Sequence, residues 1–141
     1  VTGGSLQVGT DISPVNINAV GYNPLDNYVY GMDSAASGTG LIRVGSDFSV
    51  QTLGFPAGLP NSLGFNIGEF DNNGHYWINQ GATGNVYEVD LKPGSATYFQ
   101  VVGTHPINAI AGFAGGGEWA YAPVDGFLYR TPTIATTGVM N

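Results

Sequence analysis

Aromatic and apolar residues alternate with polar ones in short runs along the chain, and no segment keeps the period of an amphipathic helix. The block YNPLDNYVYG at 22–31 returns as FDNNGHYWIN at 70–79 and as YAPVDGFLYR at 121–130. In each block, residues that tolerate the positive φ of tight hairpins separate two strand-like runs. Each block therefore predicts a strand, a tight turn and a second strand.

Two of the blocks are followed by further apolar runs. Residues 41–44 and 50–54 follow the first block, and residues 86–90 and 98–103 follow the second. They predict a third and a fourth strand, so the repeating unit has four strands in about 40 to 50 residues, which is the period of a β-propeller blade. We predict an all-β fold with essentially no helix.

The third unit lacks its last strand, and a matching strand stands at the start of the chain. Residues 6–10, LQVGT, resemble residues 99–104, FQVVGT. We therefore predict one domain over residues 1–141, with blades at about 17–54, 65–103 and 107–141, and a strand at about 5–10 that completes the third blade. The expected inner strands include 17–22, 65–70 and 107–121.

Three blades are too few to close a ring, because propellers contain about four to eight. Two copies would supply six blades, and each N-terminal strand would then complete the third blade of the partner. Such pairing would remove the exposed sheet edges at both ends of the chain. We predict a homodimer that forms a six-bladed ring.

Three segments carry a resemblance to a known family: INAVGYNPLDNYVYG at 17–31, LIRVGSDFSVQTLG at 41–54 and AYAPVDGFLYR at 120–130. They resemble the repeats of secreted, functionally uncharacterised β-propellers of fungi and bacteria, which are distant relatives of the YVTN and NHL-type repeats. The resemblance covers about residues 5–130. Its motifs occupy turn, strand and core positions, so it implies a fold and no catalytic residue.

Charge restricts the possible partners. The net charge is −7, and the only basic residues are Arg43, Lys92 and Arg130. A chain this poor in cations cannot follow a phosphate backbone or an anionic lipid surface, so we expect neither nucleic acid nor membrane as a partner. It has no Cys, which excludes a disulfide framework and argues against a small disulfide-stapled secreted domain. Pro93 after Lys92 leaves trypsin few sites. We expect a secreted, extracellular protein that begins at Val1 after removal of a leader or trimming.

No motif predicts catalysis or metal binding. The acidic residues are scattered, and the chain has no nucleophile elbow or phosphate loop. The segment 69–74, EFDNNG, begins like a calcium loop, but the ninth position is Trp77 and no acid follows at the twelfth, so a hairpin turn explains it better. His75 and His105 have no third ligand at metal spacing. We expect no enzymatic activity, no metal and no cofactor.

Several polar positions have structural interpretations. Asp26, Asp71 and Asp125 recur at the hairpins, where turn chemistry explains them. The glycine cluster 115–117 predicts a bend or bulge near an inner strand. His75 is expected to be solvated at a hairpin tip, and His105 to lie in a loop that links a fourth strand to the next first strand.

The longer links predict where a ligand would bind. Segments 33–40, 55–63, 80–84 and 131–138 are longer than the tight turns and rich in neutral polar residues. Function concentrates on such loops, and their amides and hydroxyls suit a neutral ligand such as a glycan. We expect ligand contacts from seven residues: Asp33, Ser34, Asn61, Asn79, Gln80, His105 and Arg130.

The favoured function is therefore a non-enzymatic, lectin-like propeller, in which aromatic residues at a rim stack on sugar rings. Two alternatives stay open. One is a structural or protein–protein interaction scaffold, and the other is a hydrolase or lyase that acts at the central channel. Binding residues repeated in every blade would favour the lectin, whereas a lone acidic cluster at the channel mouth would favour the enzyme.

Overall fold

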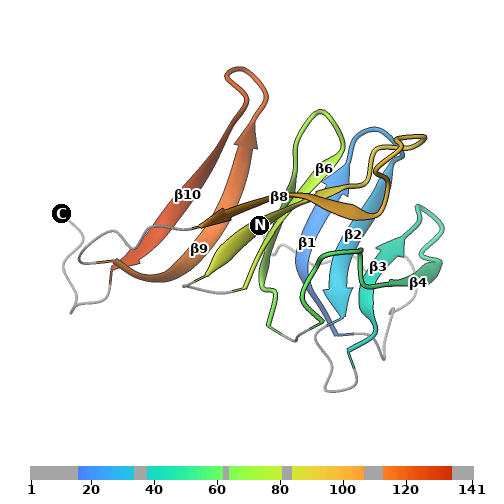
Figure 1. Ribbon diagram of the computed structural model, residues 1–141, viewed down its shortest axis with the longest axis horizontal. Helices are drawn as coiled ribbons and strands as arrows, with labels where there is room; N and C mark the ends of the chain where they lie inside the picture. The colour runs from blue at the N-terminus through green and yellow to red at the C-terminus, as the bar shows by residue number, and fades with distance from the viewer. Residues whose placement is uncertain (1–15, 34–37, 62–63, 81–83, 107–112, 135–141) are drawn as a thin grey trace, which may run out of the picture.

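The computed structural model describes residues 16–33, 38–61, 64–80, 84–106 and 113–134, and these form three antiparallel sheets without a helix (Figure 1). The all-β prediction is confirmed. Sheet A is a meander of β1 (Ile17–Asn23), β2 (Tyr28–Asp33), β3 (Gly40–Val44) and β4 (Val50–Gly54). Sheet B repeats this order with β5 (Ile67–Phe70), β6 (His75–Asn79), β7 (Asn85–Asp90) and β8 (Gln100–Pro106). Sheet C pairs β9 (Phe113–Ala122) with β10 (Phe127–Ile134).

The three sheets lie in a row, with sheet B between sheets A and C (Figure 1). Strand β1 packs beside β5, and β5 packs beside β9. The first strands of the three repeats are therefore neighbours. The expected strands at 5–10 and 138–141 lie outside the described residues.

Repeated aspartates build two of the hairpin turns in the same way. Asp26 accepts hydrogen bonds from the amide of Tyr28 at 3.0 Å and the hydroxyl of Tyr30 at 2.6 Å. Asp125 accepts from the amide of Phe127 at 3.0 Å and the hydroxyl of Tyr129 at 2.7 Å. The residue before β2, β6 and β10 has positive φ in each repeat, at 64°, 82° and 76°. These bonds confirm the turn chemistry predicted for both aspartates.

The core lies between sheets A and B. The ring of Phe70 lies 5.3 Å from that of Tyr30 and stacks on that of Tyr76 at 4.8 Å. Tyr76 is fully buried and donates a hydrogen bond from its hydroxyl to the carbonyl oxygen of Ala19 on β1. Gly68 on β5 makes this approach possible, because an added Cβ would lie 2.6 Å from the Tyr76 hydroxyl and closer still to the Ala19 carbonyl.

Strand β9 contains the irregularity predicted from its glycine cluster. Arg130 pairs with Trp119, and Pro132 pairs with Gly116. An advance of three residues along β9 therefore matches an advance of two residues along β10. Such a mismatch is a β-bulge, in which extra residues on one strand are left unpaired and the strand bends. The predicted bulge near residues 115–117 is confirmed.

Candidate functional site

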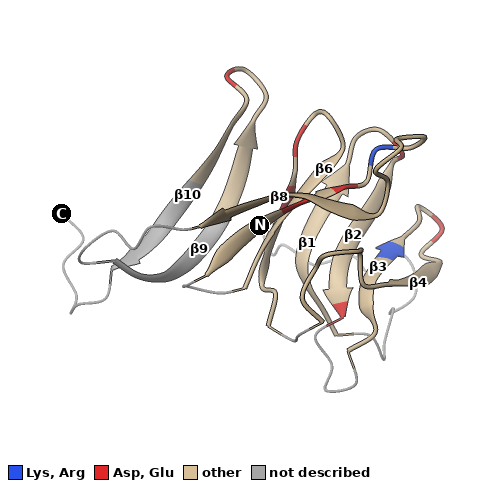
Figure 2. Ribbon diagram, viewed as in Figure 1, with Lys and Arg blue, Asp and Glu red and all other residues tan. Residues whose placement is uncertain are grey.

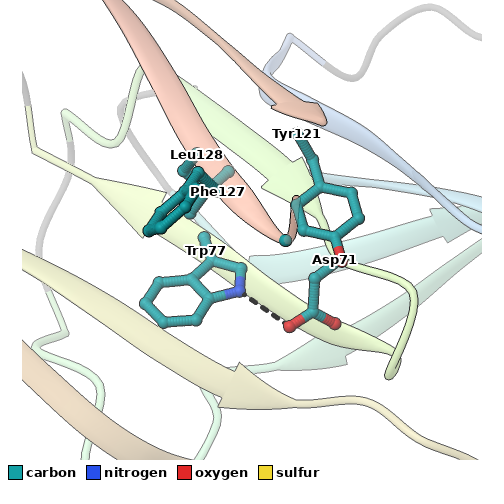
Figure 3. A pocket seen from close by; sticks show the side chains of 6 residues that line it. Asp71, Trp77, Tyr121, Phe127 and Leu128 are labelled. Carbon is teal, nitrogen blue, oxygen red and sulfur yellow. Dashed lines mark hydrogen bonds between the residues drawn. The ribbon is translucent and has the colours of Figure 1, made fainter. Parts of the chain in front are cut away.

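A pocket of about 240 Å³ opens between sheets B and C, at the tight-turn end of the sheets (Figure 3). Trp77 on β6 and Asp71 in the β5–β6 turn line it from sheet B. Tyr121 on β9 lines it from sheet C, together with the start of β10 and the turn before it, residues 126–128. Two neighbouring hairpins thus supply aromatic walls and one carboxylate.

The repeat relates this pocket to the packed interface between sheets A and B. Trp77 is the third residue of β6, as Tyr30 is the third residue of β2. Tyr121 pairs with the second residue of β10, Leu128, as Phe70 pairs with the second residue of β6, Tyr76. The pocket residues therefore occupy the positions of the packed rings of Tyr30, Phe70 and Tyr76.

One substitution within the repeat explains why the first interface is closed and the second is open. Tyr30 and Tyr76 are fully buried between sheets A and B, and Phe70 between them is 3% exposed. Sheet C carries Leu128 where sheet B carries Tyr76, so an aromatic ring is missing from the second interface. Trp77 and Tyr121 are only half-buried, which leaves their rings accessible to a ligand.

Asp71 is held rigidly at the edge of the pocket. Its Oδ1 accepts hydrogen bonds from the amides of Asn73 and His75, both at 2.9 Å, and its Oδ2 accepts one from Nε1 of Trp77 at 3.1 Å (Figure 3). The bonds to the turn confirm the structural role predicted for Asp71. An ionised carboxylate has about four acceptor positions, so capacity remains for a ligand hydroxyl.

A glutamate joins the two histidines beside the pocket. Glu88 Oε1 lies 2.7 Å from Nδ1 of His75, and its Oε2 lies 3.3 Å from Nε2 of His105. The His105 ring also lies 5.2 Å from that of Trp77. Gly103 provides the space, because an added Cβ would lie 2.5 Å from Glu88 Oε2 and 2.6 Å from His105 Nε2.

These contacts correct two predictions. His75 is not at a solvated hairpin tip: it is the first residue of β6, and 27% of its side chain is exposed. His105 is not in a loop but within β8, opposite Val86. The sequence reasoning missed Glu88, although strand alternation and the pairing of Glu88 with Trp77 put it on the same face of sheet B as His75.

Sheet A has different side chains at two of the corresponding positions, Tyr28 for His75 and Arg43 for Glu88. Arg43 pairs with Tyr30 as Glu88 pairs with Trp77. Its guanidinium lies 4.6 Å from the centre of the Tyr28 ring, and its Nε donates to Oε1 of Gln51 at 2.9 Å. A cation–π contact in sheet A thus replaces the contact between Glu88 and His75 in sheet B. Within the described part of the chain, no three His, Cys, Asp or Glu side chains are grouped to hold a metal ion.

The seven residues predicted to bind ligand are spread over all three sheets and their links. Those whose side chains the structure describes do not line the pocket. Asp33 is buried and accepts hydrogen bonds from the amide and hydroxyl of Thr39. Asn79 is buried and donates to the Asn85 carbonyl at 3.1 Å, while its Oδ1 has no hydrogen-bond partner. His105 contacts Glu88 and Trp77.

For three of the other four predicted residues the structure gives a position or an exposure. Asn61 is exposed in the link between sheets A and B, and Gln80 is half-buried just after β6. Arg130 is paired through its backbone with Trp119. Ser34 lies outside the described residues. The proposal that these loops bind a ligand stays a prediction.

The family model for a "Repeat of unknown function (DUF6923)" matches residues 5–140. The chain belongs to this family. The DUF6923 match spans all three hairpin blocks, which confirms that the chain consists of repeats of an uncharacterised family. Searches of curated proteins and of solved structures gave no match. Within the ranges that the structure describes, no helix is long and apolar enough to cross a membrane.

Proposed function

We propose that this protein is a secreted, non-enzymatic, lectin-like protein that binds a carbohydrate ring in the pocket between sheets B and C. One observation carries the proposal. The repeat builds a closed stack of three rings between sheets A and B, whereas the same positions between sheets B and C surround a pocket of about 240 Å³. Secretion rests on the composition and on the resemblance to secreted repeats.

The chemistry of the pocket suits a sugar. The faces of Trp77 and Tyr121 carry partial negative charge, which attracts the polarised C–H groups on one side of a pyranose. Asp71 offers an acceptor for a hydroxyl group. The volume is below the roughly 300–1,000 Å³ of pockets for drug-sized ligands, so it fits a single ring rather than a long chain.

Charge argues against an anionic ligand. Asp71 lines the pocket, and Asp125 belongs to the turn of the neighbouring hairpin; Figure 2 marks acidic segments in both turns. Among the residues whose side chains the structure describes, no Lys or Arg lines the pocket. A phosphate or carboxylate would therefore meet the carboxylate of Asp71, which repels it.

We propose further that the three sheets are blades of a β-propeller and that two copies close a six-bladed ring. The support is the succession of two four-stranded meanders and the packing of β1 beside β5 and β5 beside β9, as inner strands of adjacent blades do. The rigid blades would hold the pocket in a fixed geometry.

A glycan array with the intact protein tests the carbohydrate proposal. We expect binding to neutral glycans with an accessible pyranose face, and a loss of at least about tenfold in affinity for Trp77→Leu, because stacking on an aromatic ring is worth about 1–3 kcal/mol in a comparable case. Phe48→Leu, in the exposed β3–β4 turn, is the matched control and should bind normally.

Two results would point elsewhere. An intact protein that binds no glycan on the array would favour the scaffold alternative. Binding that survives Trp77→Leu but is lost in Asn61→Ala would place the ligand at the long loops.

A further inference from the structure

The two ends of the row of sheets expose apolar side chains. On the outer face of sheet A, Val20 is 54%, Tyr22 51% and Val29 37% exposed. We call this surface the A face. On the outer side of sheet C, Tyr129 is 55% and Val124 97% exposed. We call this surface the C face.

Each face corresponds to one half of the buried interface between sheets A and B. Tyr129 is the third residue of β10, as Tyr30 is of β2, and each hydroxyl donates to the aspartate four residues earlier. The pKa of both hydroxyls is raised. Burial is the main cause for Tyr30, and the hydrogen bond to Asp125 is the main cause for Tyr129. Yet Tyr30 is fully buried and Tyr129 is not.

The difference in burial has one cause, which is the presence of a next sheet. Phe70 of sheet B lies 5.3 Å from Tyr30 and covers it. The residue that corresponds to Phe70 in sheet A is Tyr22, which pairs with Val29 as Phe70 pairs with Tyr76. The A face therefore carries the side chains that would cover Tyr129.

The turn residues repeat the same relationship. Leu25, between Pro24 and Asp26, reaches across to the next hairpin, where an added Cβ on Gly74 would lie 2.8 Å from its Cδ1. Val124 stands at the same place in the third block, between Pro123 and Asp125, and has no following hairpin to contact in the described chain.

We propose that a second copy of this chain docks head to tail, with Tyr129 and Val124 of the C face packed against Tyr22 and Val29 of the A face. Two such contacts close a ring of two copies, and closure leaves neither face exposed. This inference rests on the six-bladed ring proposed above and names the side chains that hold it. It is independent of the carbohydrate pocket, whose residues all lie within one copy.

Analytical ultracentrifugation of the intact chain tests the docking. The wild type should sediment as a species with twice the 14.6 kDa mass of one chain. Tyr22→Glu and Tyr129→Lys should each raise the dissociation constant about 100-fold or more, because each places a charge where apolar side chains would meet. Val124→Glu should act in the same direction without disturbing the fold, since this side chain is 97% exposed. Phe48→Glu is the control and should leave the dimer intact.

Mixing the two charged variants tests the head-to-tail arrangement. A mixed dimer of Tyr22→Glu and Tyr129→Lys has one wild-type contact and one in which the introduced lysine faces the introduced glutamate. It should therefore form at least about tenfold more tightly than the dimer of either variant alone. Circular dichroism of each variant confirms that it is folded.

Each other outcome overturns the inference at an identifiable step. A monomeric wild type would contradict the ring as well as the docking. A dimer that survives all three charged substitutions would leave a ring closed by strand exchange and remove the proposed docking. Variants that dissociate but do not restore each other would contradict the head-to-tail contact between the A face and the C face. Glycan binding is measured in a separate experiment, and its result does not affect how these sedimentation results are interpreted.

Discussion

Gly68 permits the closest approach between sheets A and B, and replacing it tests that approach. In Gly68→Ala, the new methyl group would lie 2.6 Å from the hydroxyl and 2.8 Å from Cε2 of Tyr76, and nearer to the backbone of Ala19. The backbone of β1 cannot move without disturbing the strand, so β1 and β5 must separate. Separation also breaks the hydrogen bond from Tyr76 to Ala19.

Both effects lower the free energy of unfolding. Overpacking in a filled core costs about 1–3 kcal/mol, and the loss of a buried hydrogen bond adds about 1 kcal/mol. We therefore expect Gly68→Ala to cost about 2–4 kcal/mol, a large part of the roughly 5–15 kcal/mol that is typical of a folded domain. Tyr76→Phe alone should cost about 1–3 kcal/mol, because it leaves the buried Ala19 carbonyl without its donor.

Urea unfolding followed by circular dichroism measures these changes, at one protein concentration because assembly shifts apparent stability. The double variant should be less destabilised than the sum of the single variants, since removing the hydroxyl relieves one of the clashes. Gly94→Ala is the control: nothing lies within 4 Å of its added Cβ, so only backbone strain at its positive φ remains. A Gly68→Ala protein within about 0.5 kcal/mol of the wild type would refute the close packing of β1 on β5.

Three further predictions concern electrostatics. Burial alone would raise the pKa of Asp90, but hydrogen bonds from Ser95, Thr97 and a backbone amide outweigh burial and lower it. The stabilisation of the fold by ionised Asp90 is therefore present above about pH 4 and lost on acidification. Asp90→Asn should flatten the acid side of the pH profile of the unfolding free energy, measured by urea unfolding. Gly103→Ala should displace Glu88 from its histidine partners and shift the histidine ring signals in NMR spectra, with a cost of only about 1 kcal/mol because flexible side chains can yield. Since each copy carries a net charge of −7, raising the salt concentration should strengthen the dimer, and weakening with salt would contradict an apolar interface.

The hairpins could be predicted from sequence because their determinants are local. Asp26 and Asp125 contact residues two and four positions ahead, so the same short pattern produces the same turn wherever it occurs. The bulge in β9 is also local, because it follows from a run of glycines. Such features need no knowledge of how the sheets pack.

The pocket could not be located in this way, because it depends on how two hairpins pack together. Trp77 and Tyr121 are far apart in sequence and meet only when β5 lies beside β9. Loop length and polarity predicted a binding site at the other end of the sheets, where the long loops lie. A position-by-position comparison of the repeats shows only part of the signal, since the position that Tyr76 occupies in sheet B carries Val29 in sheet A and Leu128 in sheet C.

The fluorescence of Trp77 gives the most direct test of carbohydrate binding in the pocket. Trp119, the other tryptophan, is half-buried with an unpaired Nε1, so Trp119→Phe removes an unsatisfied donor and leaves Trp77 as the only indole. Titration of this variant with a neutral glycan that binds on the array should give a saturable change in Trp77 emission, with the same dissociation constant as calorimetry. Calorimetric binding without any change in Trp77 emission would contradict a sugar ring stacked in the pocket.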